Sequence, residues 1–280
     1  MATLSTDIRS NCTTSHPESK FDFETAVGNY LEFAPVMLWP SREVVTILLY
    51  LSLVLVILPR YMAHRRPYKL QTFLHLYNVG QIAVNLVLCY MYVDIMNFKP
   101  LNVWQNTCEA VKTANGDHDL NLTNKMINFA LLFSVNKTMD LLDTVIFCLK
   151  KKQSHVTFLH VYHHVVMKLA TSFSLFNHYT VDLNTIMAGL NSFVHVAMYT
   201  YYLLANMGPR MRRYLWWKSH LTKLQILQFL VIITLLAKLQ WQGCQYTTNN
   251  IFIPLWTFTI GSIFLLFCHF YYKTYKIKTS

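Results

Sequence analysis

The sequence has few charged residues for its length. Only 13% of its 280 residues are charged and just 7 are glycine, whereas 54% are hydrophobic. A soluble domain usually carries about 25% charged residues, so this composition argues against one and indicates a helical membrane protein. The net charge of +11 does not indicate a partner such as nucleic acid, because the basic residues form short clusters between apolar runs. Internal repeats, low-complexity tracts and a Gly-rich phosphate loop are also lacking, which leaves one domain.

Apolar runs recur along the chain, and about 20 such residues cross a bilayer. We place seven spans at Val44–Leu58, Phe73–Tyr92, Met126–Leu149, Val156–Phe176, Ile186–Ala205, Leu221–Gln240 and Ile251–Tyr272. The first is short and the third contains charged residues, so the sequence supports six or seven. We therefore predict an all-α integral membrane protein, with a polar segment at 1–35, a transmembrane domain at 36–272 and a basic tail at 273–280.

Basic residues are distributed unequally between the two sets of loops. With seven spans, one side holds Arg60, Arg65, Arg66, Lys69, Lys150, Lys151, Lys152, Arg210, Arg212, Arg213, Lys218, Lys273, Lys276 and Lys278. The opposite side holds only Lys99, Lys112 and Lys125. Because positive loops stay in the cytosol, we predict a cytosolic C-terminus and a luminal N-terminus. The first 30 residues lack the apolar core of a cleavable signal peptide, so the first span is the expected targeting element.

Several residues bear on the luminal side and on localisation. Asn11 and Asn121 begin Asn-X-Thr sequons on the predicted luminal side, and we expect glycosylation there. Cys108 and Cys244 lie in two luminal loops, where they either form a disulfide or remain free thiols. Lys276 and Lys278 match a dilysine signal for retrieval to the endoplasmic reticulum, or they simply anchor the last helix.

The third span contains ionisable residues on one stripe. Lys137, Asp140 and Asp143 follow one another at three-residue spacing. Ionisable groups at the centre of a span cost at least ~2.5–3.5 kcal/mol each, so we expect them to face the protein interior. They form either a structural ion pair or a polar wall for a charged substrate.

The fourth span contains three histidines within five residues. His160, His163 and His164 have i, i+3, i+4 spacing, which places their rings on one helical face. A single buried histidine is usually a satisfied core residue, but three together in a membrane helix indicate a functional site.

The fifth and sixth spans supply further polar stripes. The stripe in the fifth comprises Asn191, His195, Tyr199 and Tyr202, and the one in the sixth includes Gln225 and Gln228. The glutamines have interhelical hydrogen bonding as a competing explanation. At ~1.5 Å rise per residue, all four stripes reach the cytosolic half of the bundle. This convergence predicts a single buried polar site.

Four segments resemble, in order, the signatures of the very-long-chain fatty acid elongases of the ELO type. They are KTMDLLDT (Lys137–Thr144), HVYHH (His160–His164), HVAMYTYY (His195–Tyr202) and TKLQILQ (Thr222–Gln228). One residue departs from the family pattern KxxExxDT, because Asp140 stands where Glu is usual. The resemblance implies seven helices, six of them ringing an acyl-binding tunnel closed at its luminal end. It also implies a disulfide between Cys108 and Cys244.

The resemblance further implies a 3-oxoacyl-CoA synthase of the endoplasmic reticulum. Such an enzyme joins acyl-CoA to malonyl-CoA and has no permanently bound cofactor or metal. The implied partners are the reductases and dehydratase of the elongation cycle, and a second copy of the chain in a homodimer. The family's acyl-imidazole maps to His163, with His160 or His164 orienting that ring and with His195 and Asn191 stabilising an oxyanion or assisting decarboxylation. The remaining polar residues would bind or brace the substrate: Lys137, Asp140, Asp143, Tyr199, Tyr202, Gln225 and Gln228.

Two other classes of protein compete with this interpretation. A membrane di-iron desaturase or hydroxylase also contains HxxHH boxes and imidazole suits iron, but it needs about eight histidines in several boxes. A transporter or receptor would use the polar stripes as a binding path, but the repeats and Gly/Pro-broken helices typical of transporters are not seen.

Overall fold

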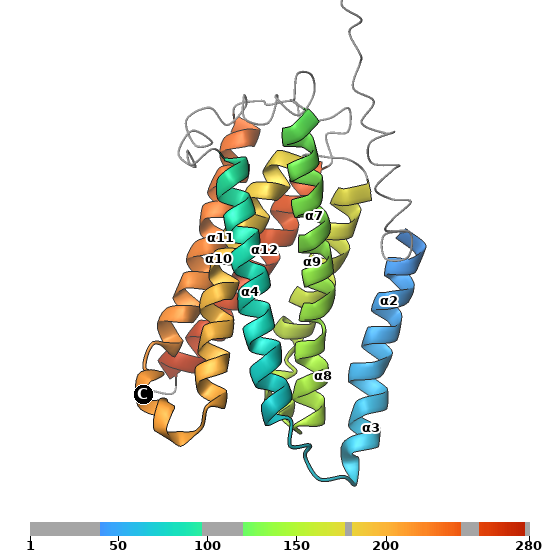
Figure 1. Ribbon diagram of the computed structural model, residues 1–280, viewed down its shortest axis with the longest axis vertical. Coiled ribbons are helices and arrows are strands. Elements are labelled where there is room, and N and C mark those ends of the chain that lie inside the picture. Colours follow the sequence, from blue (N-terminus) through green and yellow to red (C-terminus); the bar gives the residue numbers. More distant parts are fainter. Residues whose placement is uncertain (1–39, 97–119, 177–180, 242–251, 278–280) are drawn as a thin grey trace, which may run out of the picture.

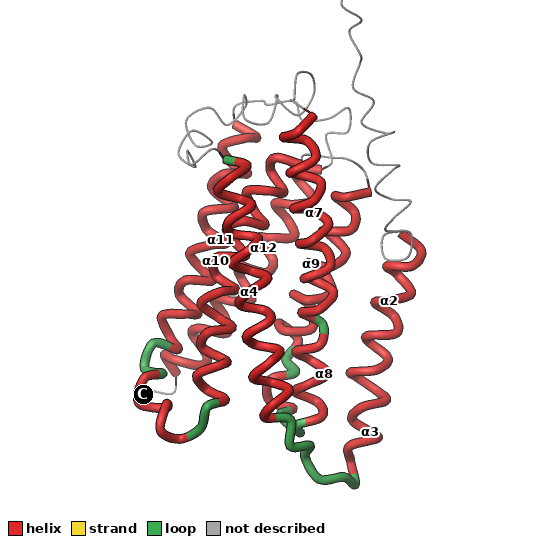
Figure 2. The backbone as a smooth tube through the Cα atoms, viewed as in Figure 1, coloured by secondary structure: helices red, strands yellow, loops and turns green. Residues whose placement is uncertain are grey.

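The part of the chain that the structure describes consists of helices and short connections. The computed structural model describes residues 40–96, 120–176, 181–241 and 252–277, and no strand occurs in those ranges (Figure 2). The helical elements in chain order are α2 (Pro40–Ser52), η1 (Leu53–Ile57), α3 (Leu58–Ala63), α4 (Gln71–Ile95), α7 (Leu120–Asp140), α8 (Leu142–Leu149), η3 (Gln153–His155), α9 (Phe158–Phe176), α10 (Val181–Asn206), η4 (Pro209–Tyr214), α11 (Lys218–Trp241), α12 (Phe252–Tyr271) and η5 (Tyr272–Lys276).

Four of the described helical segments are long and apolar enough to cross a membrane. They are Arg42–Ala63, Gln71–Ile95, Lys218–Trp241 and Ile253–Lys276. The helices that carry most of the polar motifs, α7, α9 and α10, run beside them (Figure 1). The chain is therefore an all-α, multi-pass membrane protein, as the composition predicts. The count of seven spans and the tunnel stay predictions.

The long helices run up and down between two ends of the bundle (Figure 1). The segments that follow α3, α8 and α10 all lie at the lower end of the view, as does the end of η5. Basic residues of these segments include Arg65, Lys151, Arg213 and Lys276. Clusters of positive charge that are far apart in the sequence therefore share one end of the molecule, which is the pattern on which the topology prediction depends.

The first helical segment, α2–η1–α3, stands at the edge of the bundle (Figure 1). One of its faces exposes apolar side chains such as Leu48 and Leu49, and the other buries Tyr50, Val54 and Leu58. Pro59 has no N–H and its ring would crowd the carbonyl of residue 55 in a regular α-helix. The wider turn of η1, in which the Leu58 N–H reaches the Leu53 carbonyl, carries the helix through this proline.

The main apolar core is formed by α4, α7, α10, α11 and α12. Leu88, Phe129, Leu183, Leu236 and Ile263 come from these five helices in turn, and each is at most 1% exposed. A smaller apolar cluster joins α2 and α3 to α8 and α9. These contacts hold the polar helices α7, α9 and α10 against one another.

Close packing between α4 and α10 depends on a glycine. A Cβ added at Gly189 would lie 2.4 Å from ring atoms of Tyr92. We expect Gly189→Ala to unfold at a lower temperature in detergent, because overpacking of this kind costs about 1–3 kcal/mol. Gly80→Ala is the matched control on α4, since nothing lies within 4 Å of its added Cβ. Equal unfolding midpoints for the two variants would contradict the close contact.

Candidate functional site

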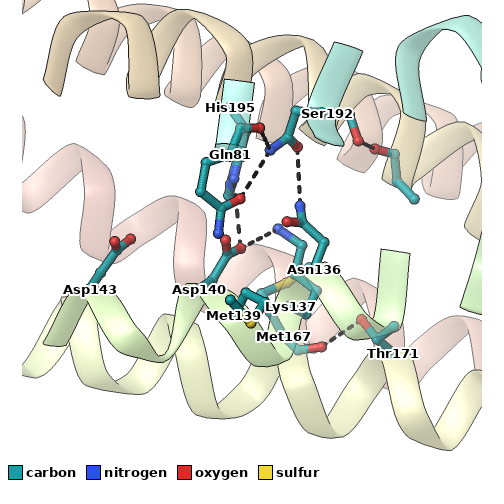
Figure 3. A network of polar contacts seen from close by, with 12 residues as sticks. Gln81, Asn136, Lys137, Met139, Asp140, Asp143, Met167, Thr171, Ser192 and His195 are labelled. Carbon is teal, nitrogen blue, oxygen red and sulfur yellow. Dashed lines mark hydrogen bonds and ion pairs between the residues drawn. The ribbon is translucent and has the colours of Figure 1, made fainter. Parts of the chain in front are cut away.

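A buried ion pair lies where α7 ends. The Lys137 ammonium donates to Asp140 Oδ2 at 2.7 Å, and their side chains are 4% and 2% exposed (Figure 3). The α-helical pattern is interrupted at Leu141, whose N–H reaches back to the Thr138 carbonyl at 3.3 Å before α8 begins. Asp140 and Asp143 therefore lie on either side of a local irregularity in the helix. The predicted stripe of ionisable residues does face the interior.

Tyr199 connects the two carboxylates. Its hydroxyl lies 2.9 Å from Asp140 Oδ1 and 2.9 Å from Asp143 Oδ2, and its side chain is fully buried. A phenol has one proton, so it can donate to only one carboxylate at a time. Two carboxylates that contact the same hydroxyl would repel each other if both were ionised. A proton shared between them, or the nearby positive charge of Lys137, would reduce this repulsion.

His195 and Asn191 contribute polar atoms without partners. His195 Nδ1 lies 3.7 Å from Asp140 Oδ2, which is too long for a hydrogen bond (Figure 3). Neither His195 Nδ1 nor Asn191 Oδ1 has a hydrogen-bond partner among the described residues, although both atoms are buried. Buried polar groups are normally hydrogen-bonded, so these two are candidates for contacts with a substrate.

The histidines of α9 differ in their surroundings. His160 Nε2 lies 3.0 Å from Thr144 Oγ1, which in turn lies 2.6 Å from the Tyr50 hydroxyl. His163 instead lies against Phe229 and Phe267, with ring centroids 6.5 and 6.1 Å away. Thus a hydrogen bond holds His160. Among the described residues, the ring of His163 instead packs against aromatic rings.

His164 lies between these two histidines. Its ring centroid is 4.4 Å from that of His160 and 5.4 Å from that of His163, and it is 8% exposed. The three rings thus form one cluster, as their spacing predicts.

The first motif joins the two groups of polar residues. Asp140 contacts Tyr199 and approaches His195 of α10, and Thr144 contacts His160 of α9. The segment from Lys137 to Thr144 therefore bridges both groups. The structure thus brings together the predicted stripes of α7, α9 and α10.

The remaining predicted residues lie at the margin of the cluster. The ring of Tyr202 contacts that of Tyr199 at 6.0 Å between centroids. Gln225 donates to Met198 Sδ at 3.8 Å rather than to a histidine. Gln228 is buried at 7% exposure, one residue before Phe229. Gln225 thus contacts α10, and Gln228 lies inside the bundle.

A second buried ion pair was missed by sequence reasoning. Lys168 Nζ lies 2.9 Å from Glu43 Oε1 and 3.3 Å from Ser172 Oγ, and both charged side chains are almost fully buried. The signal was present, since Lys168 lies one turn after His164 in an apolar run. The pair joins α9 to α2, 125 residues earlier in the chain.

A polar ladder on α4 was also missed. Tyr77, Gln81 and Asn85 are linked by hydrogen bonds along α4, and Asn85 accepts one from Asn136 of α7 at 3.3 Å. The Tyr77 hydroxyl also donates to the Met139 carbonyl at 3.1 Å. Spacing of four residues between these amides could have identified the stripe. The ladder supports the segment of α7 that carries Lys137 and Asp140.

Two lysines lie close to His155, in the loop that leads into α9. Partial burial against Phe147, together with the charges of Lys152 and Lys218, lowers the pKa of His155 from its ordinary value. The two lysines belong to segments that are far apart in the sequence. Their joint effect places both near the loop that leads into α9.

Several predicted features lie outside the described residues or are only partly described. Cys108, Cys244, Asn11 and Lys278 fall outside them, as does the side chain of Asn121. Lys276 is described and exposed. Cys89, Cys148 and Cys268 lie in α4, α8 and α12 and are free cysteines.

Comparison with known proteins identifies the class of this membrane protein. Residues 35–280 match the model of the family described as ELO: GNS1/SUR4. The chain therefore belongs to the ELO family. Similar proteins include very long chain fatty acid elongase 1 of Mus musculus, which is 33% identical over 86% of this chain and 84% of its own length. The human protein of the same name is 34% identical over the same shares. Very long chain fatty acid elongase 7 of Rattus norvegicus is 32% identical over 91% and 86%.

The family assignment does not favour the competing desaturase interpretation. The described residues also hold no group of three His, Cys, Asp or Glu side chains arranged to bind a metal ion. The residue set is instead one cluster of imidazoles beside one cluster of carboxylates.

Proposed function

We propose that this chain is the condensing enzyme of fatty acid elongation. It joins a long-chain acyl-CoA to malonyl-CoA, giving a 3-oxoacyl-CoA two carbons longer, CoA and CO2. The names of its relatives support fatty acid elongation. The observation that carries the condensing step is the cluster of three imidazoles beside a buried Lys–Asp pair, joined by the segment from Lys137 to Thr144.

His163 is the proposed nucleophile. Its aromatic surroundings suit a neutral imidazole, which is the nucleophilic form. A ring nitrogen bonds to the thioester carbonyl carbon, the carbon–sulfur bond breaks, and the CoA thiolate takes the proton released from the imidazole. The product is an acyl-imidazole, an intermediate reactive enough to transfer its acyl group onward.

Malonyl-CoA then completes the reaction. Its decarboxylation releases CO2 and leaves an electron pair on the α-carbon, which attacks the acyl carbon. The bond to His163 breaks, and that nitrogen recovers a proton from solvent. His195 would stabilise the negative charge that develops on oxygen by donating from its unpartnered Nδ1, and Asn191 would do so by donating from its amide nitrogen.

The remaining polar residues would bind or brace the CoA end. They are Lys137, Asp140, Asp143, Tyr199, Tyr202, Gln225 and Gln228. CoA phosphates would meet basic residues such as Lys152 and Lys218, which lie near the loop into α9. Asp140 pairs with Lys137, although its side chain is one methylene shorter than that of the glutamate usual in the family pattern.

The cellular setting follows from the same proposal. We place the chain in the endoplasmic reticulum membrane, with seven spans, six of them around a tunnel, a luminal N-terminus and a cytosolic C-terminus. Cys108 and Cys244 would tie two luminal loops together. The reductases and dehydratase of the elongation cycle would act on its product.

An elongation assay tests the proposed function. Membranes containing the chain should convert acyl-CoA and labelled malonyl-CoA into a labelled 3-oxoacyl-CoA that is two carbons longer. A series of acyl-CoA lengths would define the preferred substrate. Purified protein that contains stoichiometric iron and forms no such product would contradict the proposal. That result would instead support the di-iron desaturase interpretation.

A further inference from the structure

A chain of three hydrogen-bonding side chains links the edge helix to the histidine cluster. The Tyr50 hydroxyl of α2 lies 2.6 Å from Thr144 Oγ1 of α8, and Thr144 Oγ1 lies 3.0 Å from His160 Nε2 of α9. Tyr50 is 6% exposed and Thr144 is fully buried. The described residues give the Tyr50 hydroxyl no other hydrogen-bond partner. Most other side chains of α2 face outward or pack in the apolar cluster.

The number of protons in this chain sets its direction. Tyr50 and Thr144 each carry one hydroxyl proton, and a buried hydroxyl proton needs an acceptor. If Tyr50 donates to Thr144 and Thr144 donates to His160 Nε2, both hydroxyl protons have acceptors. The ring proton is then on Nδ1, which is not among the fully buried side-chain atoms that lack a partner in the described part of the chain. If His160 Nε2 carried a proton and donated to Thr144, the two hydroxyls could share only one further hydrogen bond, with either Tyr50 or Thr144 as its donor. The other hydroxyl proton would then have no acceptor among the described residues, which is unfavourable inside a membrane.

We propose that Tyr50 is a positioning residue that, through Thr144, fixes His160 as the tautomer with its proton on Nδ1. The inference rests on the proposed function for its consequence. The Nε2 lone pair of His160 is occupied by the Thr144 hydroxyl, so His160 cannot serve as a nucleophile through that atom. The cluster is thereby divided into one histidine held by hydrogen bonding, His160, and one free for chemistry, His163. The edge helix thus contributes to the site through Thr144.

The tautomer of His160 is directly measurable. Nitrogen NMR of the full chain in detergent, with labelled histidine, distinguishes a protonated from an unprotonated ring nitrogen, and the resonances lost in His160→Gln identify this residue. We expect Nε2 of His160 to be unprotonated in the wild-type protein. Tyr50→Phe should produce both tautomers, because the Thr144 hydroxyl can then accept as well as donate. Thr144→Val should do the same, whereas Thr144→Ser should retain the wild-type signal.

Activity provides the second readout. Tyr50→Phe should lower kcat about tenfold and change KM less than about twofold, as expected for the loss of one orienting hydrogen bond. Tyr61→Phe is the matched control. It removes the same atom from a tyrosine on the continuation of the same helix, whose hydroxyl contacts the exposed Tyr68 hydroxyl at 3.0 Å. The control should leave both the tautomer and kcat unchanged.

Three outcomes would overturn the inference. The first is a protonated Nε2 on His160 in the wild-type protein. The second is an unchanged tautomer signal in Tyr50→Phe when kcat falls, since the hydroxyl would then support only packing. The third is a Tyr50→Phe variant that matches wild type in both readouts. Because the NMR signal does not require turnover, a wild-type protein with the expected tautomer but no elongation product would count against the proposed function alone.

Discussion

Replacing His163 with alanine should lower the rate of 3-oxoacyl-CoA formation by roughly a thousandfold or more, because the proposed mechanism has no path without the acyl-imidazole. The change leaves the hydrogen bond between Thr144 and His160 in place. The contacts it removes are ring contacts with His164, Phe229 and Phe267, so the folded state should persist. The rate is measured with labelled malonyl-CoA under saturating acyl-CoA.

A matched control separates the nucleophile from histidines in general. His269 lies near the end of α12 and is exposed, so His269→Ala should retain activity within about twofold of wild type. Both variants should elute as folded protein and unfold near the wild-type temperature. If folded His163→Ala formed product at the wild-type rate, His163 would not be the nucleophile.

Breaking the buried pair between Lys168 and Glu43 should destabilise the protein strongly. Removing one partner of a buried ion pair leaves an uncompensated charge and typically costs about 3–5 kcal/mol. The pair joins α9 to α2 through Glu43 Oε1, and Glu43 Oε2 has no hydrogen-bond partner among the described residues. We therefore expect Lys168→Met and Glu43→Gln each to lower the unfolding temperature in detergent, with Lys168→Met leaving a bare buried carboxylate.

The double variant makes this prediction specific. Lys168→Met combined with Glu43→Gln removes both charges, so it should be more stable than Lys168→Met alone. Asp94→Asn is the control, because Asp94 pairs with Lys125 at 2.8 Å on the half-exposed surface, where such pairs contribute about 0–1 kcal/mol. Additive losses in the double variant would show that the two side chains stabilise the protein independently.

Helix positions were predictable from apolar runs, but their ends and irregularities were not. The run Val44–Leu58 stops at Pro59, yet the helix continues to Ala63 because η1 accommodates the proline. The run Met126–Leu149 contains a break at Leu141 that no residue type in it marks. Hydropathy registers burial in lipid, whereas these details depend on backbone hydrogen bonds between particular turns.

The candidate site was predictable where its residues share a helix. Spacing alone places Lys137 beside Asp140, and it also groups the three histidines of α9. Contacts between helices were different, because spacing within one helix does not report them. The tie from Tyr50 to Thr144 joins residues 94 positions apart, so only the packed structure reveals it.

Direct detection of the acyl-enzyme tests the central claim most sharply. The wild-type protein is mixed with acyl-CoA in the absence of malonyl-CoA, digested at neutral pH and analysed by mass spectrometry. The account predicts an acyl group on His163 that disappears when malonyl-CoA is added, with 3-oxoacyl-CoA formed in its place. An active enzyme that carries no acyl group on His163, or carries it on another residue, would contradict the account.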